Sequence, residues 1–188
     1  METTDLAVHV RTPSRLHFGL LAFGDAAPRQ FGGVGVMIER PETEVLVRLR
    51  HSTAPLLDPM SVATNRARDF AVTFLSSLDS KDHLALLDRL EVCVPRAPAE
   101  HMGLGSGTQL AMAIARALAA FVGESDMTSP ELARRVGRGK RSAIGVHGFQ
   151  CGGFIVEAGK RDACEISPLV ARLNFPAEWH FVLVIPTA

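Results

Sequence analysis

A glycine-rich loop, residues 98–109 (PAEHMGLGSGTQ), has the residue types of an anion-binding site at the start of a helix. Alternating glycines permit left-handed backbone conformations and let main-chain N–H groups approach a ligand closely. The Ala- and Leu-rich run that follows predicts a helix whose N-terminus adds unpaired N–H groups and a positive dipole end. The loop therefore predicts a phosphate site, with a plain helix start as the alternative. Its candidate ligand contacts are Gly103, Leu104, Gly105, Ser106, Gly107, Thr108 and Gln109, of which Ser106 and Thr108 are also the candidate metal ligands through their hydroxyls.

Arg15 and His17 are two residues apart in the N-terminal segment RTPSRLHFGLL. If that segment is extended, both side chains face the same side. Guanidinium binds carboxylate or phosphate bidentately, and imidazole exchanges a proton near neutral pH. The pair is therefore a candidate for anion recognition by Arg15 and proton transfer by His17. The alternatives are a solvated strand arginine and a hydrogen-bonded core histidine.

Two further glycine-rich segments contain candidate site residues. Gly33, in the segment FGGVG, permits either a turn into a strand or a close approach to a ligand. Ser142 and His147 lie in residues 137–153, a segment that we expect to face the glycine-rich loop. A short basic run there is either a solvated face or a phosphate-binding group. Its members are Arg138, Lys140 and Arg141.

Composition limits the classes of function. The chain has 188 residues, of which 47% are hydrophobic and 21% charged, as expected of a globular protein with a real core. Lys plus Arg and Asp plus Glu number 20 each, so no bulk charge attracts nucleic acid or an anionic membrane. Three cysteines without a CxxC spacing disfavour a disulfide framework and a structural zinc site. No signal peptide and no membrane span are evident, so we expect a cytoplasmic protein.

The elements that must position these residues are mixed in type. Apolar and alternating runs predict strands at 6–10, 16–21, 34–38 and 45–49, with Pro13 and Pro41 as breaks. Helical spacing predicts a helix over 62–78, with Asp58 as N-cap before Pro59, and another over 108–122. A shorter helix to Val136 is expected to begin at Ser129-Pro130, and a short helix is expected within 137–153. Further strands are predicted at 90–95, 154–156 and 181–185. This order favours an α+β fold.

Two motifs resemble those of the GHMP superfamily, which includes galactokinase, homoserine kinase and mevalonate kinase. The loop matches the second motif of the superfamily, Pro-x-x-x-Gly-Leu-Gly-Ser-Ser, at Pro98, Gly103, Leu104, Gly105 and Ser106. The segment RTPSRLHFGLL is similar to its first motif at Pro13, Arg15 and Gly19. The resemblance implies a GHMP-type N-terminal domain over residues 1–188, similar to the ribosomal protein S5 domain 2-like fold. It implies a mixed sheet with helices packed on one face.

The departures from the kinases point to one branch of the superfamily. Gly107 stands where the kinases have a second, magnesium-binding serine, and Gly145 stands where many of them have a catalytic aspartate. Both departures are normal in the β-ribofuranosylaminobenzene 5′-phosphate synthase family. The chain resembles that family in four segments, TPSRLHFGLL, FGGVGVMIERPETEV, HMGLGSGTQLA and GRGKRSAIGVHGFQCGGFIVEAG.

The resemblance implies a phosphoribosyl transfer. That family condenses 5-phosphoribosyl 1-pyrophosphate with 4-aminobenzoate, releases carbon dioxide and pyrophosphate, and serves methanopterin biosynthesis. It implies Mg2+ with the pyrophosphate and no organic cofactor. Arg15 and His17 would be catalytic, and the loop N–H groups would stabilise the departing pyrophosphate. The expected partners are these small molecules and a second copy of the chain, in a homodimer or a larger assembly, with no nucleic acid and no membrane.

Two alternative functions remain open from the sequence. One is a GHMP small-molecule kinase that uses ATP, against which Gly107 and Gly145 count. The other is a truncated, non-catalytic member that acts in binding or assembly. Residues 175–188 would then be the start of a C-terminal domain that is missing. Activity of the 188-residue chain alone is therefore an open expectation.

Overall fold

The computed structural model describes residues 7–22, 24, 28–49, 62–78 and 82–185. Two long strands, β1 (Ala7–Leu21) and β2 (Gly32–Leu49), run antiparallel through the whole sheet. On the other side of β2, β3 (Leu90–Arg96) pairs with its C-terminal half and β4 (Phe154–Glu157) with its N-terminal half. The strand β5 (Leu169–Leu173) adds to β4. Every pair among these described strands is antiparallel, which refines the expected mixed sheet.

The predicted breaks at Pro13 and Pro41 are wrong, because both prolines lie inside continuous strands. Regular pairing of β1 with β2 stops between Thr12 and Ser14 and resumes beyond the proline. Residues 39–42 of β2 lie opposite this interruption. A proline is tolerated in a sheet where its missing N–H would make no ladder hydrogen bond. The two prolines therefore share one bulged region instead of dividing the chain into four short strands.

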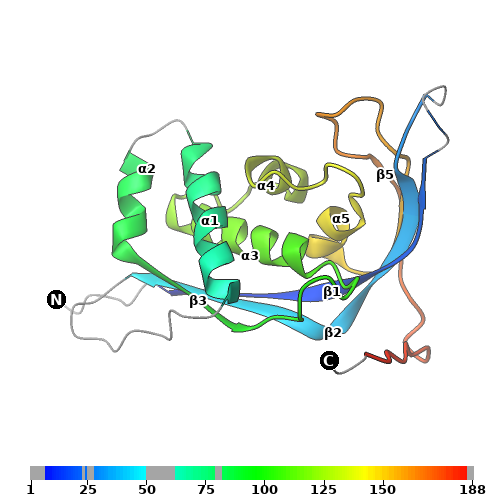
Figure 1. Cartoon of the computed structure of the whole chain (residues 1–188), viewed down its shortest axis with the longest axis horizontal. Helices are drawn as coiled ribbons and strands as arrows, with labels where there is room; N and C mark the ends of the chain where they lie inside the picture. Colours follow the sequence, from blue (N-terminus) through cyan, green and yellow to red (C-terminus); the bar gives the residue numbers. More distant parts are fainter. Residues whose placement is uncertain (1–6, 23, 25–27, 50–61, 79–81, 186–188) are drawn as a thin grey trace.

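The helices all lie on one face of the sheet, as Figure 1 shows. They are α1 (Val62–Ser76), α2 (Asp82–Ala85), α3 (Ser106–Phe121), α4 (Ser129–Arg135) and α5 (Ile144–Cys151), with a 3-10 turn at Leu86–Arg89. The central helix α3 packs against α1, α4, α5 and the two long strands. The arrangement is the α+β architecture expected, with helices on one face.

Several helix boundaries differ from the predictions. The expected N-cap Asp58 and Pro59 lie outside the described residues. The helix α3 begins two residues earlier than predicted, after Gly105. The N-cap of α4 is Thr128 and not Ser129, because the Thr128 side chain and Glu131 form a reciprocal capping box. Boundaries of this kind depend on individual cap contacts, which apolar spacing does not reveal.

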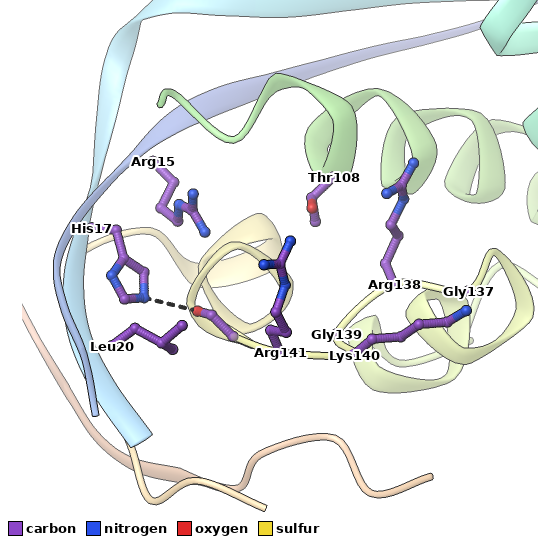
Figure 2. Close-up of a pocket in the computed structure, with 10 residues that line it drawn as sticks. Arg15, His17, Leu20, Thr108, Gly137, Arg138, Gly139, Lys140 and Arg141 are labelled. Carbon is purple, nitrogen blue, oxygen red and sulfur yellow. Dashed lines mark hydrogen bonds between the residues drawn. The ribbon is translucent and has the colours of Figure 1, made fainter. Parts of the chain in front are cut away.

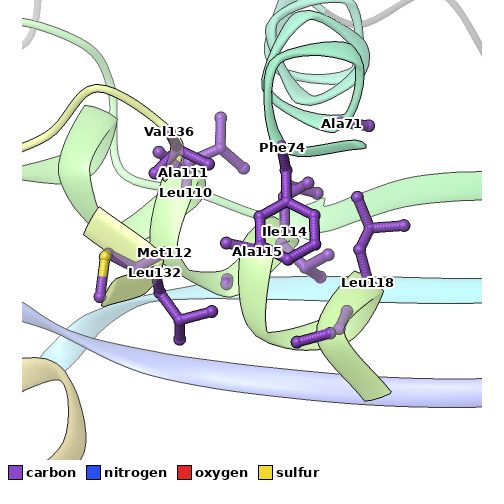
Figure 3. Close-up of a cluster of buried hydrophobic side chains, with 14 of the residues drawn as sticks. Ala71, Phe74, Leu110, Ala111, Met112, Ile114, Ala115, Leu118, Leu132 and Val136 are labelled. Carbon is purple, nitrogen blue, oxygen red and sulfur yellow. The ribbon is translucent and has the colours of Figure 1, made fainter. Parts of the chain in front are cut away.

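The main core surrounds α3, which is buried on almost every side (Figure 3). Small alanines along this helix allow close packing, while Phe74 of α1 and Leu132 of α4 fill the space between helices. Val45 and Val47 of β2 close the core from the sheet. Because both ends of α3 are packed in this way, the glycine-rich loop at its N-terminus is attached to a rigid support.

The predicted strand at 181–185 is wrong, since these residues form no strand. Val182 and Val184 are 87% and 90% exposed, whereas the edge of β4 is taken by β5, which sequence reasoning missed. Phe175 and Leu183 pack on a small apolar cluster that includes Val36 of β2. The assignment of residues 175–188 to a further domain stays a prediction. Within the part of the chain that the structure describes, no helix is long and apolar enough to cross a membrane.

Candidate functional site

A cavity of about 470 Å³ lies between β1, the start of α3 and the segment that joins α4 to α5. Figure 2 shows side chains from these three elements directed into it. Arg15 and His17 come from the same side of β1, as their spacing predicted. The lining residues are Arg15, His17, Leu20, Thr108, Gly137, Arg138, Gly139, Lys140, Arg141 and Ser142.

The charge of this cavity is strongly positive. Arg15, Arg138, Lys140 and Arg141 line it, and no acidic side chain is among its lining residues. Burial lowers the pKa of Arg15, an effect that the carboxylate of Glu157 opposes. Burial and the neighbouring Arg66 lower the pKa of Arg138 in the same way. Burial disfavours the charged form of each cation, and a bound anion would offset this cost. The cavity is therefore suited to phosphate or carboxylate groups.

Two arginine nitrogens in this region are buried without a hydrogen-bond partner in the described part of the chain. They are Nε of Arg15 and Nε of Arg138. A buried donor that makes no hydrogen bond costs free energy. Both guanidinium groups therefore keep unused hydrogen-bond donors beside the cavity. The cation of Arg138 also lies 4.7 Å from the centre of the Phe70 ring, which holds its side chain in place.

The glycine-rich loop is attached directly to β1. The backbone N–H of Arg15 donates to the Leu104 carbonyl at 2.9 Å, and the Leu104 side chain is buried. Gly103 and Gly105 have φ angles of 75° and 72°, a region that strongly favours glycine. A Cβ at Gly105 would also lie 3.3 Å from the Arg15 side chain. The glycines thus let the loop turn into α3 while Arg15 packs beneath it.

A second hollow, of about 280 Å³, lies over the loop itself. Thr108 and Arg138 line both the cavity and this hollow, so the two adjoin. Arg66 of α1 lies over the first turn of α3, where a Cβ at Gly107 would come within 3.0 Å of its Nη2. The hollow is lined by Arg66, Glu100, His101, Gly103, Gly105, Ser106, Gly107, Thr108 and Arg138. The site therefore has two adjoining regions whose cationic side chains are suited to anions.

His17 is connected to a buried carboxylate through a serine. Its Nε2 lies 3.1 Å from Oγ of Ser142, which donates to Oε1 of Glu157 at 2.7 Å. The second oxygen of Glu157 accepts the backbone N–H of Ala143 at 2.6 Å. Burial, and then the charge of Arg15, lower the pKa of His17. The imidazole is therefore neutral near pH 7 and suited to accept a proton.

Not every predicted site residue lines these two regions. Gln109 is fully buried and its Nε2 donates to the Gly145 carbonyl at 2.9 Å, so it joins α3 to α5. The Nε2 of His147 lies 2.8 Å from the Ser167 carbonyl, and His147 is absent from the lining of both regions. Gly33 lies behind His17, where a Cβ would come within 3.3 Å of the ring. These residues support the site and do not face its interior.

Sequence reasoning missed Arg66 and Glu157. In the sequence, Arg66 is one charged residue of a predicted helix, which normally indicates the solvent-exposed face of that helix. Only the packing of α1 brings Arg66 over the loop. Glu157 ends β4 and is 3% exposed. A buried carboxylate at a strand end was detectable only as an acidic residue after the apolar run FIV, which is a weak signal.

The oxygen groups available for a metal ion are few. Ser106 and Thr108 contribute hydroxyls to the hollow, and the carboxylate of Glu100 is paired with Arg66. No cluster of three or more metal-binding side chains occurs among the described residues. Mg2+ commonly binds substrate phosphates and water with few protein ligands. The residues present therefore fit a magnesium ion that enters with a phosphate-bearing ligand better than one held by protein alone.

At Gly145, where many kinases have an aspartate, a side chain would be tightly packed. A Cβ at this position would lie 3.1 Å from the Gln109 amide nitrogen and 3.5 Å from the Thr108 methyl group. It would also lie 3.8 Å from Cδ of Arg15. A side chain at 145 would thus enter the site, but the Gln109 hydrogen bond occupies the space that it needs.

Comparison with known proteins identifies relatives of this chain. Residues 76–154 match the family described as the GHMP kinases N terminal domain. The beta-ribofuranosylphenol 5'-phosphate synthase of Methanothermobacter thermautotrophicus is 36% identical over 191 residues, covering 94% of this chain and 57% of the relative. The protein of the same name from Archaeoglobus fulgidus is 31% identical over 198 residues, covering 95% of this chain and 57% of the relative. The chain thus spans less than two thirds of the length of these relatives.

Solved structures share the fold at lower identity. Homoserine kinase from Cytophaga hutchinsonii superposes with a TM-score of 0.57 at 18% identity, covering 94% of this chain and 55% of that chain. Mevalonate kinase from Staphylococcus aureus MRSA252 superposes with a TM-score of 0.53 at 16% identity, covering 89% of this chain and 56% of that chain. Likeness at this level concerns the fold alone, since one fold hosts many activities.

Proposed function

We propose that the chain serves phosphoribosyl transfer in methanopterin biosynthesis, because residues 76–154 match the GHMP kinases N terminal domain and most of the chain is similar to curated beta-ribofuranosylphenol 5'-phosphate synthases. The donor is 5-phosphoribosyl 1-pyrophosphate and the acceptor a para-substituted benzoate. The products are a C-riboside 5′-phosphate, carbon dioxide and pyrophosphate. The chain spans 57% of the length of each of these relatives.

The observation that carries this proposal is the pair of adjoining anion-binding regions. The donor has a monophosphate at one end of its ribose and a pyrophosphate at the other. The loop hollow, with its glycine N–H groups and the N-terminus of α3, suits the pyrophosphate. The basic run Arg138, Lys140 and Arg141 in the cavity suits the 5-phosphate.

Each bond change in the proposed reaction has a counterpart in the site. The C1–O bond of the ribose breaks and pyrophosphate leaves with the electron pair, stabilised by the loop N–H groups. The ring carbon that bears the carboxylate bonds to C1, carbon dioxide leaves, and the electron pair returns to the ring. Arg15 holds the carboxylate or the adjacent phosphate until departure. His17 accepts a proton from the para substituent during attack and returns it afterwards, so no net proton is consumed.

Magnesium belongs to this proposal as a companion of pyrophosphate. Ser106 and Thr108 are the residues that would contact it, beside the loop. When bound, the ion would neutralise charge on the leaving pyrophosphate. No organic cofactor is part of the proposal.

Two ring acceptors are consistent with the proposal. The resemblance carried by the motifs implies 4-aminobenzoate, which gives an aminobenzene riboside. The relatives are named for a ribofuranosylphenol product, which requires a hydroxyl on the ring. 4-Hydroxybenzoate is therefore a second acceptor to test, and both fit a mechanism in which His17 takes a proton from the para group.

Carboxyl-labelled acceptor tests the proposal directly. The purified protein, with Mg2+ and 5-phosphoribosyl 1-pyrophosphate, is expected to release labelled carbon dioxide and pyrophosphate in equal amounts, with release dependent on both substrates. Comparing 4-aminobenzoate with 4-hydroxybenzoate at equal concentrations identifies the preferred ring. A folded protein that binds the donor and releases no carbon dioxide from either acid would contradict the proposal.

The same preparation distinguishes the two alternatives. Transfer of the ATP γ-phosphate to an alcohol would favour a kinase, although the space at Gly145 argues against one. Binding of the donor without turnover would favour a non-catalytic member. We also propose a cytoplasmic homodimer, which cell fractionation and sedimentation can test.

A further inference from the structure

We propose that Glu157 is a positioning residue that acts through Ser142 to hold His17 in the tautomer protonated at Nε2. Glu157 lies at the end of β4, Ser142 precedes α5 and His17 belongs to β1, so three elements meet in this contact. The catalytic meaning of the tautomer rests on the proposed function. The tautomer itself depends only on the hydrogen bonds of the protein.

Counting donors and acceptors around Ser142 determines the position of each proton. The Glu157 carboxylate accepts only, so the Ser142 hydroxyl must donate its single proton to Oε1. The backbone N–H of Ile144 donates to the same Oγ at 3.2 Å. The serine then has one acceptor position left and no proton to give. His17 Nε2, at 3.1 Å, can complete the contact only as a donor.

The surroundings keep this arrangement in a single state. Glu157 is 3% exposed and its second oxygen is held by the Ala143 N–H, so its carboxylate has little freedom to rotate. Behind the imidazole, Gly33 lies so close that a Cβ would be 3.3 Å from the ring. Arg15, on the same strand, is a cation that disfavours a second proton on the ring. Arg138, Lys140 and Arg141 line the same cavity and are also cationic.

A neutral imidazole with its proton on Nε2 has its lone pair on Nδ1. The buried carboxylate thereby determines which nitrogen is basic, as second-layer carboxylates do for catalytic histidines elsewhere. In the proposed reaction, a proton accepted by His17 would therefore go to Nδ1. Glu157 itself touches no substrate.

Glu157→Gln is expected to reverse the tautomer. The Ala143 N–H can only donate, so the amide oxygen must face it and the amide NH2 must face Ser142 Oγ. Oγ then receives two donors, from the amide and from Ile144, and its own proton turns to His17 Nε2. That contact requires an unprotonated Nε2, so the ring proton moves to Nδ1.

Nitrogen-15 NMR of the imidazole rings tests the proposal on the full chain without ligand. Histidine-labelled protein is examined at about pH 8, where an ordinary imidazole is neutral. The His17 signals are assigned by their loss in His17→Gln. We expect the Nε2–H pattern in the wild type, the Nδ1–H pattern in Glu157→Gln and a mixture in Ser142→Ala. As a matched control, Glu44→Gln removes a carboxylate bonded directly to His9 and should alter His9 alone.

Two results would overturn the proposal. One is an Nδ1–H pattern for His17 in the wild type, a measurement that needs no variant to fold. The other is an unchanged Nε2–H pattern in folded Glu157→Gln. Because the tautomer is measured without substrates, it fails or holds independently of carbon dioxide release, which tests the proposed function.

Discussion

Arg15 is held from both its backbone and its side chain. Its N–H donates to Leu104 in the loop, and its guanidinium lies under Gly105 with Nε buried and unpartnered among the described residues. This placement explains why an arginine, whose planar group donates in two directions, is suited to the position. Lysine would keep the positive charge, but its ammonium group could not donate two parallel hydrogen bonds to one anion.

The first prediction concerns Arg15. Arg15→Met should weaken binding of 5-phosphoribosyl 1-pyrophosphate roughly 10- to 100-fold, since a hydrogen bond to a charged group contributes about 1.5–3 kcal/mol. Arg15→Lys should recover only part of that loss. Titration calorimetry with this donor measures both, with Arg96→Met as a control at an exposed arginine paired with Glu42. Equal affinity in wild type and Arg15→Met would place the anion elsewhere.

The second prediction concerns His17 and pH. Burial and Arg15 lower its pKa in the folded state, so as pH falls below about 6.5 the unfolded chain gains a proton that the folded chain does not. This histidine should therefore reduce stability progressively as the pH falls from about 6.5 to its lower native pKa, and by a constant amount below that. Urea unfolding of wild type and His17→Gln across this range isolates the effect. A stability difference that is independent of pH would contradict it.

At the scale of elements, glycines determine how closely β1 and β2 approach beneath the site. A Cβ at Gly33 would lie 2.4 Å from the Gly19 carbonyl oxygen. A Cβ at Gly35 would lie 2.5 Å from the Leu16 carbonyl and 2.9 Å from the Ile144 side chain of α5. These contacts leave no room for a side chain. The sheet can therefore bring His17 against β2 and accept α5 above it only where the chain has glycine.

The third prediction compares two adjacent glycines of β2. Gly33→Ala should destabilise the fold by about 1–3 kcal/mol, because the methyl group meets backbone that cannot rotate away. It should also displace the His17 ring. Gly32→Ala is the matched control, since its Cβ would make only contacts of 3.4 Å. Chemical unfolding measures both variants, and equal losses at the two positions would show that the close approach has no energetic role.

The fourth prediction concerns the capping box of α4, which precedes the basic run. Thr128 accepts the N–H of Glu131, and the Glu131 carboxylate accepts the N–H of Thr128. Thr128→Ala should cost about 1 kcal/mol of unfolding free energy. Thr73→Ala, at an exposed threonine within α1, is the control. A loss no greater than that of the control would argue against the box.

At the scale of the whole molecule, charge is balanced overall and concentrated locally. The 20 basic and 20 acidic side chains sum to zero, yet the cavity lining combines four cations with no acid. Such a distribution favours the attraction of a small anion to one place on the molecule. The site, and not the net charge, decides what the chain binds.

The fifth prediction is therefore that pyrophosphate stabilises the folded chain. At about 100 times its Kd it should add about 2.7 kcal/mol, which for a chain of this size raises Tm by roughly 5–10 °C. Thermal unfolding with and without pyrophosphate measures the shift. Raising the salt concentration should reduce it by screening, and sulfate at equal ionic strength serves as the control. No shift at saturating pyrophosphate would contradict an anion site.

Local sequence patterns were enough to predict the loop, the helix after it and the shared face of Arg15 and His17. Glycine alternation, apolar spacing and strand periodicity act over a few neighbouring residues, and these features depend on nothing more. By contrast, pairing between distant segments is what places Pro13 and Pro41 within two continuous strands. The run at 181–185 forms no strand for the same reason, because a strand needs a neighbour with which to pair.

The arrangement of the site likewise depends on contacts between segments that are distant in the sequence. Arg66 and Glu157 are distant in sequence from the loop and from His17, and packing alone brings them there. Gln109 and His147 look like ligand contacts in the sequence, but hydrogen bonds to backbone carbonyls turn them to support α5 and its surroundings. A sequence records which groups are present, whereas long-range hydrogen bonds and burial determine which of them face the same space.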